Sequence, residues 1–128
     1  LNALAAAAAG FSFGMSAAEI AAALHTVAPP PQRGEILTFK ENFTVVNDSY
    51  NSNPAALLSM VKTLVDGGST AKRRIVVAGE MLELGDGAAR MHRETGEKIA
   101  ALGVDALYGV RNLAAEMTAA AHRAGLAD

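Results

Sequence analysis

The sequence predicts an α/β fold: a Rossmann-like parallel sheet with a mixed edge, flanked by helices and preceded by an alanine-rich helical segment. Two observations lead to this prediction. From residue 35 onward, short β-branched runs alternate with segments in which apolar residues have helical spacing, and this order favours helices wound around a parallel sheet. The apolar run at residues 75–78 is typical of a parallel strand that is buried on both faces.

Composition narrows the class of protein. The chain has 128 residues, which suits one compact domain with an attached segment. Its formal net charge of -2 gives no electrostatic reason to expect nucleic acid or an anionic membrane as a partner. It has no cysteine, which excludes disulfides and thiolate metal sites and fits a cytoplasmic protein.

The first segment predicts a pair of soluble helices. Glu19 is the only charged residue before His25, so there is no basic region for a signal peptide, and alanine is too weakly apolar for a membrane span. We expect a first helix over residues 1–9 that ends at Gly10. Ser16 and Glu19 then form a capping box that opens a second helix, which runs to about His25. Because the chain starts inside an apparent helix without an initiator Met, we expect a fragment of a longer protein.

A stiff, proline-rich linker at residues 29–34 is the expected domain boundary. It separates the helical segment, residues 1–28, from a domain at residues 35–128. This domain should begin with strands at 35–39 and 43–48 that are joined by a polar turn.

The rest of the domain alternates helices and strands. Asn53 and Pro54 suit the N-cap and the first position of a helix that continues to about residue 66. A strand at residues 74–79 and a helix at 88–102 follow.

A strand at residues 105–108 and a helix that Asn112 caps, ending near Gly125, are the last complete elements. Glu94 is expected to pair with Lys98 on the solvent side of the preceding helix.

The final residues resemble the lead into a strand that is missing from this chain. A three-stranded parallel sheet without its C-terminal strands would have an exposed edge, and exposed edges recruit partners. The sequence therefore predicts a dimer or strand exchange through this edge.

Several familiar sites are absent. The sequence contains no Gly-x-x-x-x-Gly-Lys-Ser/Thr phosphate loop and no Gly-x-Gly-x-x-Gly dinucleotide motif. The three histidines, His25, His92 and His122, stand on different predicted helices without metal-ligand spacing, so no metal site is predicted. The simplest interpretation of each is a surface or half-buried histidine, and His92 is the most interesting of them because it follows the loop at residues 80–85.

Polar residues follow the second strand, at the sheet edge where α/β proteins bind ligands. Asp48 could accept hydrogen bonds from two neighbouring hydroxyls, such as those of a ribose, and Ser49, Tyr50 and Asn51 can donate or accept beside it. The helix that starts at Asn53 favours a nearby anion. The alternative is a polar turn in which Asn and Asp only satisfy backbone groups, and spacing alone slightly favours that alternative.

A second loop, residues 79–85, also follows the carboxyl end of a strand. Gly79 allows a close backbone approach or a positive φ. Met81, Leu82 and Leu84 are too apolar for a free loop and are expected to pack. Glu80 and Glu83 of the same loop could bind a ligand or could be plain structure.

These two loops carry a resemblance. The first loop has the string Asp48-Ser49-Tyr50-Asn51-Ser52-Asn53-Pro54. The second has the string Gly79-Glu80-Met81-Leu82-Glu83-Leu84-Gly85, and His92 and Gly96 follow it. Together these residues resemble the Mur ligase family. Within it they resemble the members that join D-alanyl-D-alanine to UDP-N-acetylmuramoyl-tripeptide. The resemblance covers essentially the whole chain and implies the end of a central ATPase domain at residues 1–28 and most of the family's C-terminal domain at 35–128.

The resemblance also implies roles for single residues. Asn2 matches an asparagine near the adenine, and Arg33 matches a catalytic arginine that approaches the nucleotide phosphates when the domains close. Asp48 matches the aspartate that holds the ribose hydroxyls. Tyr50 and Asn51 are assigned to the neighbourhood of the nucleotide or the incoming dipeptide.

The implied reaction is ATP-dependent formation of an amide through an acyl phosphate. ATP and Mg²⁺ are the implied cofactors, and the resemblance places the Mg²⁺ ligands and the phosphate loop outside this fragment, which should be inactive alone. Two alternatives stay open: a flavodoxin-like interaction module without chemistry, and another amide ligase of the same superfamily that acts on a different amine.

Overall fold

The computed structural model describes residues 2–28 and 30–127, so Leu1, Pro29 and Asp128 of the predicted segments lie outside the described residues. The chain divides into two compact units between Pro30 and Pro31, which is inside the predicted linker. No helix in the described ranges is long and apolar enough to cross a membrane.

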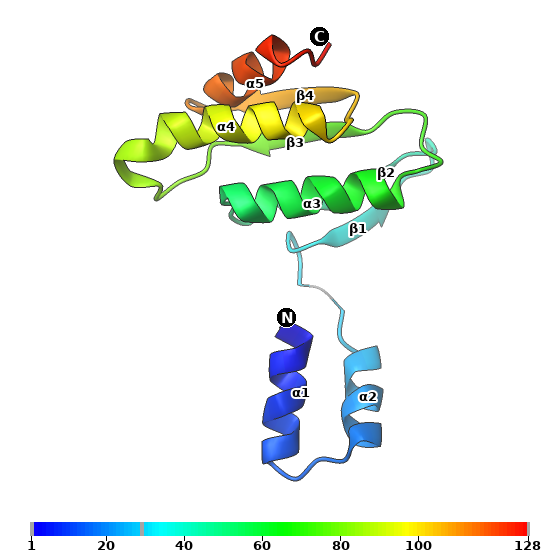
Figure 1. Ribbon diagram of the computed structural model, residues 1–128. Coiled ribbons are helices and arrows are strands. Elements are labelled where there is room, and N and C mark those ends of the chain that lie inside the picture. Colours follow the sequence, from blue (N-terminus) through cyan, green and yellow to red (C-terminus); the bar gives the residue numbers. More distant parts are fainter. Residues whose placement is uncertain (1, 29, 128) are drawn as a thin grey trace. The chain divides into compact units, whose positions relative to one another are not determined.

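The first unit is a hairpin of α1 (Asn2–Ser12) and α2 (Ala17–His25) (Figure 1). The predicted capping box is confirmed: the Glu19 N–H donates to Ser16 Oγ at 3.3 Å, and the Ser16 N–H donates to Glu19 Oε2 at 2.8 Å. The backbone N–H of Ser16, and then its hydroxyl, lower the pKa of the Glu19 carboxyl. Local sequence alone therefore determines where α2 begins.

The predicted stop at Gly10 is wrong, because α1 continues through it to Ser12. A Cβ at Gly10 would lie 3.2 Å from Cγ1 of Ile20, which is buried on the facing side of α2. The glycine therefore serves close helix packing rather than helix termination.

The second unit contains the predicted strands and helices within a few residues of the expected bounds. In chain order they are β1 (Glu35–Thr38), β2 (Thr44–Asn47), α3 (Pro54–Gly67), β3 (Ile75–Gly79), the short 3-10 turn η1 (Gly85–Gly87), α4 (Ala88–Ala101), β4 (Ala106–Val110) and α5 (Ala114–Arg123). The Asn53 side chain accepts a hydrogen bond from the Ala56 N–H at 2.9 Å, and Pro54 is the first helical residue, so the predicted start of α3 is confirmed.

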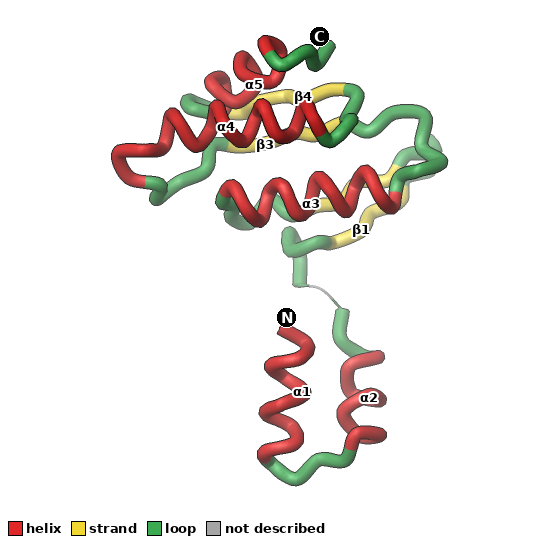
Figure 2. Tube along the Cα trace, in the orientation of Figure 1, coloured by secondary structure: helices red, strands yellow, loops and turns green. Residues whose placement is uncertain are grey.

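The strands form two separate pairs, which Figure 2 draws as separate yellow segments. β3 and β4 are parallel and β1 and β2 are antiparallel. The α/β class with a small parallel sheet flanked by helices is confirmed. The predicted three-stranded sheet is not found in the described chain, because β2 pairs with β1 through a short turn closed by the stacked rings of Phe39 and Phe43, 4.5 Å apart. A hairpin closes a much shorter loop than a crossover and is the cheaper pairing in conformational entropy.

The core lies between the helices and one face of the β3–β4 pair, and α4 lies in front of these strands in Figure 1. Its buried members are Val61, Val76, Ala78, Ile99, Val104, Leu107, Ala114, Met117 and Ala121. Side chains alternate along β3, so Ile75 and Val77 are 44% and 67% exposed. The prediction that this strand is buried on both faces is therefore wrong for the described chain.

The outer surface of α4 also differs from expectation. Glu94 Oε1 lies 3.1 Å from Nη1 of Arg90, one turn earlier, rather than pairing with Lys98. Both pairings have the same i,i+4 spacing, and such exposed pairs differ little in free energy.

An ion pair at the start of the parallel sheet should make stability depend on pH. The backbone N–H of Arg74 donates to Asp105 Oδ2 at 2.7 Å and lowers the pKa of this carboxyl, with a smaller contribution from the Arg74 side chain. The carboxylate therefore stabilises the fold above the ordinary aspartate pKa of about 4, and this contribution is lost as the pH falls through the lower, folded-state pKa. In denaturant titrations, Asp105→Asn should be less stable than the wild type at pH 7, and the gap should close below about pH 4. Asp66→Asn, in an exposed pair with Lys62, is the matched control, and a gap for Asp105→Asn that stays constant with pH would contradict the assignment.

Candidate functional site

Two loops of the second unit lead from strands into helices. Residues 48–53 connect β2 to α3, and residues 80–87 connect β3 to α4. Figure 1 shows the start of α3 and the loop into α4 on the same side of this unit. The carboxyl ends of strands in α/β folds are where ligands bind, so this side holds the candidate site.

Asp48, the first predicted site residue of the second unit after Arg33, directly follows β2. The residue is half-buried, and its carboxylate has no hydrogen-bond partner among residues 2–28 and 30–127. The hydrogen bonds of this turn are made by the neighbouring Asn47. Its Oδ1 accepts from the Ser49 hydroxyl at 2.8 Å and from the Ser49 N–H at 3.4 Å. The polar-turn interpretation therefore explains Asn47 and Ser49, whereas Asp48 takes no part in these hydrogen bonds.

Arg33 and Tyr50 are brought together although they are far apart in the sequence. The guanidinium carbon of Arg33 lies 4.1 Å from the centroid of the Tyr50 ring, a cation–π arrangement. The Tyr50 N–H also donates to the Gln32 carbonyl at 3.2 Å. Because Tyr50 is two residues after Asp48, the structure gathers a cation, an aromatic ring and an available carboxylate in one loop region.

The other predicted site residues are placed differently. Asn51 is exposed, and its Oδ1 accepts a hydrogen bond from the Ser52 N–H at 2.8 Å, so part of its binding capacity serves its own loop. Asn2 is exposed at the start of α1, in the first unit. The structure therefore brings Arg33 and Tyr50 into contact and has Asp48 and Asn51 in the same loop as Tyr50, whereas Asn2 belongs to the first unit.

The second loop is anchored by a buried histidine. His92 is fully buried, and its Nε2 accepts a hydrogen bond from the Met81 N–H at 2.9 Å. Its Nδ1 lies 2.8 Å from the Ala88 carbonyl, which can only accept. These partners require a neutral ring with the proton on Nδ1. His92 is thus a structural residue that ties α4 to the loop, and it is not available to a ligand.

The apolar residues of this loop were expected to pack, and they do so in part. Met81 is buried at 2% exposure and Leu84 is half-buried, whereas Leu82 is 63% exposed. Leu82 is therefore the most exposed of the three apolar side chains.

A polar contact at the same edge was not predicted. The Asn112 amide donates to Glu80 Oε2 at 2.8 Å, so Asn112 does not cap α5 as expected. Arg111 and Asn112 have positive φ values of 72° and 27° directly after β4. Non-glycine residues rarely adopt such values, which tend to occur at binding and catalytic sites. Their position after a short strand was the available signal, but sequence does not reveal backbone strain.

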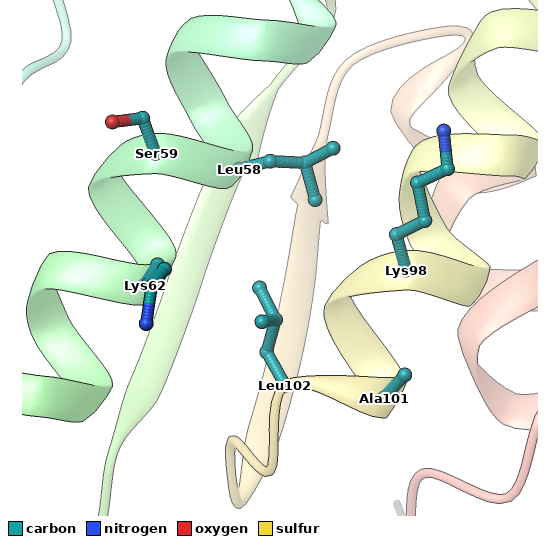
Figure 3. Close-up of a pocket in the computed structure, with 6 residues that line it drawn as sticks. All are labelled: Leu58, Ser59, Lys62, Lys98, Ala101 and Leu102. Atoms are coloured by element: carbon teal, nitrogen blue, oxygen red, sulfur yellow. The ribbon is translucent and has the colours of Figure 1, made fainter.

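A groove lies elsewhere in the unit. A groove of about 530 Å³ between α3 and α4 is lined by Leu58, Ser59, Lys62, Lys98, Ala101 and Leu102. Figure 3 shows Leu58 and Leu102 extending into the gap between the helices. The groove lies at the carboxyl end of α4, and the loop at residues 80–87 is at the opposite end. In the described ranges no three His, Asp or Glu side chains gather closely enough to hold a metal ion.

Comparison with known proteins gives consistent matches. Residues 32–127 match the family model described as Mur ligase, glutamate ligase domain. The UDP-N-acetylmuramoyl-tripeptide–D-alanyl-D-alanine ligase of Mycobacterium leprae is 34% identical over 121 residues, covering 85% of this chain and 23% of that protein. The ligases of the same name from Escherichia coli K12 and Bacillus subtilis 168 are 34% and 30% identical, covering 85% and 90% of this chain and 24% and 25% of their own length.

Solved structures agree at the level of the fold. A crystal structure of MurF from Acinetobacter baumannii superposes with a TM-score of 0.80 at 24% identity, covering 93% of this chain and 25% of that one. The chain spans about a quarter of the length of the curated relatives that it matches. Together with the family model, which covers Arg33, Asp48 and Tyr50, these matches show that the chain belongs to the Mur ligase family.

Proposed function

We propose that this chain is part of an ATP-dependent peptide ligase that adds D-alanyl-D-alanine to UDP-N-acetylmuramoyl-tripeptide in peptidoglycan precursor synthesis. The names of the relatives support ligation of these two substrates. The observation that carries the proposal is the contact of the Arg33 guanidinium with the ring of Tyr50, two residues after Asp48, whose carboxylate has no hydrogen-bond partner in the described ranges. A cytoplasmic location is part of the same proposal.

The residues on this edge fit a nucleotide. A carboxylate without a protein partner can accept hydrogen bonds from both hydroxyls of a ribose, which is the role proposed for Asp48. Arg33 has five N–H donors and suits phosphate oxygens. Asn2 is proposed to contact the adenine, and Tyr50 and Asn51 to line the same region.

In the proposed reaction ATP phosphorylates the carboxylate of the tripeptide substrate, and the dipeptide amine then displaces phosphate to form the amide. Charge develops on oxygens during this transfer, and a positioned cation such as Arg33 would stabilise it. Mg²⁺ ligands and a phosphate loop are assigned to parts of the enzyme other than this chain, whose sequence contains no such loop. The 128-residue chain alone is therefore proposed to be inactive and to bind ATP weakly.

The test of the nucleotide assignment is Asp48→Ala in the ligase that contains this chain. Loss of hydrogen bonds to a charged group should lower kcat/KM for ATP by about tenfold to a hundredfold. The KM for D-alanyl-D-alanine should change little. Asp66→Ala, which removes an exposed carboxylate on α3, is the control. Normal kcat/KM for ATP in Asp48→Ala would remove Asp48 from the nucleotide site.

We also propose that the isolated chain self-associates through the β3–β4 pair. Among the described residues these strands pair only with each other, and Ile75, Val77, Tyr108 and Val110 expose apolar side chains along them. Open edges and apolar faces of this kind promote pairing with a second copy. Small-angle scattering at high protein concentration should give a dimeric mass, which Val77→Lys should reduce. A monomeric mass for the unmodified chain would contradict the proposal.

A further inference from the structure

The contact between Arg33 and Tyr50 is the main interaction that orients the Arg33 side chain. Both side chains are exposed, and Tyr50 is 63% exposed, so burial does not hold either in place. An exposed arginine has many accessible rotamers, and a contact that selects one of them reduces the entropy lost when a ligand binds. The guanidinium lies 4.1 Å from the ring centroid, within the range of a cation–π interaction.

The backbone beneath this contact is tied at several points. Gln32 has a φ of 62° and its carbonyl accepts from the Tyr50 N–H, which joins the segment before Arg33 to the segment that carries the ring. Glu35 Oε2 accepts from the Gln32 N–H at 3.3 Å and from Asn47 Nδ2 at 3.2 Å. The chain on the Arg33 side is thereby connected to the end of β2, so the ring and the guanidinium are placed by the fold.

An aromatic ring holds an arginine in a different way from a carboxylate. None of the ion pairs among residues 2–28 and 30–127 includes Arg33. A carboxylate partner would neutralise the positive charge and occupy two N–H donors. The face of a tyrosine ring orients the guanidinium plane while it leaves the charge and the N–H edge available to an anion.

We propose that Tyr50 is a positioning residue, whose ring holds the Arg33 guanidinium ready for the nucleotide phosphates. This inference rests on the proposed ligase function. It assigns to Tyr50 an action through Arg33 and no required contact of its own with substrate. Positioning of Arg33 depends on the Tyr50 ring and not on its hydroxyl, because the hydroxyl has no hydrogen-bond partner among the described residues.

The first test measures the contact in this chain without reference to activity. Protons of the Arg33 side chain that lie over an aromatic ring should resonate upfield of their usual positions in NMR spectra. Tyr50→Phe should keep this displacement and Tyr50→Leu should abolish it. Equal Arg33 shifts in all three proteins would overturn the proposal.

The second test measures the role in the ligase that contains this chain. Tyr50→Leu should lower kcat by about three- to tenfold, the range expected for loss of one cation–π contact, and Tyr50→Phe should restore it. In an Arg33→Ala background Tyr50→Leu should have no further effect, because the two residues act as a unit. A further loss in that background, or failure of Tyr50→Phe to restore turnover, would overturn the positioning role. If Arg33→Ala has normal turnover while the NMR displacement is present, the proposed function of Arg33 fails and the contact stands.

Discussion

Gly96→Ala should destabilise the second unit by about 3 kcal/mol, one of the larger costs for a single methyl group. A Cβ at this position would lie 2.0 Å from the Met117 carbonyl oxygen and 2.8 Å from its carbon. These are backbone atoms of α5, so relief requires the whole helix to move rather than one rotamer to change. Ile99 and Met117 on either side are fully buried, which means that such a movement opens the core.

The matched control for this prediction is Gly67→Ala at the end of α3. A Cβ there meets nothing within 4 Å, so the substitution should stabilise by about 0.5–1 kcal/mol through helix propensity alone. The two variants make the same chemical change in helices of one unit, and they should have opposite signs. The chain has no Trp, so urea unfolding is best followed by circular dichroism at 222 nm. A Gly96→Ala midpoint at or above that of the wild type would contradict the close approach of α4 and α5.

Secondary structure could be predicted closely from local sequence. The start of α2 depends on Ser16 and Glu19, and the start of α3 depends on Asn53 and Pro54. These signals act within a single turn of helix, so they are independent of tertiary packing. The same holds for the hairpin of β1 and β2, whose strands are joined by a short polar turn.

Two of the failed predictions concern residues whose partner lies on another element of the fold. Gly10 reads as a helix stop, but its lack of a side chain serves Ile20 of the facing helix. Asn112 reads as a cap, but its amide donates to Glu80, and no side chain makes a cap hydrogen bond at the start of α5. Glycine can end a helix or allow close packing, and asparagine can cap a helix or bond to a distant side chain. Only the fold shows which of these roles applies.

The candidate site, too, could be predicted only in part from local sequence. The chemistry of Asp48 could be proposed from its place after a strand, but spacing did not separate a ligand-binding carboxylate from a turn residue. In the structure Asn47 makes the hydrogen bonds of the turn and Asp48 makes none among the described residues, which is why we propose Asp48 as the ligand-binding residue. The stacking of Arg33 on Tyr50 is likewise invisible in the sequence, because it depends on how residues 31–34 turn back beside the end of β2.

Arg33→Ala should lower kcat of the ligase that contains this chain by about a hundredfold or more, the range for removal of a group that stabilises transition-state charge. The KM for UDP-N-acetylmuramoyl-tripeptide should change little, because the proposed contact is with phosphate oxygens whose charge grows in the transition state. Arg33→Lys keeps the charge but loses the planar fork and its stacking on Tyr50, so it should recover only part of the loss.

Arg90→Ala provides the control for the Arg33 measurement. Arg90 is an exposed arginine on α4 that pairs with Glu94, and it lies outside the Asp48 loop region, so turnover should be unchanged. Steady-state kinetics with each substrate varied in turn would separate a loss in kcat from a loss in affinity. If Arg33→Ala raises the KM for ATP and leaves kcat intact, Arg33 binds the ground state only and is not catalytic. A fall in kcat with little change in the KM for ATP or for UDP-N-acetylmuramoyl-tripeptide would mean that Arg33 acts mainly in the transition state, as charge moves between the phosphates and the substrate carboxylate. The free N–H edge of the guanidinium and its fixed position on Tyr50 support this role.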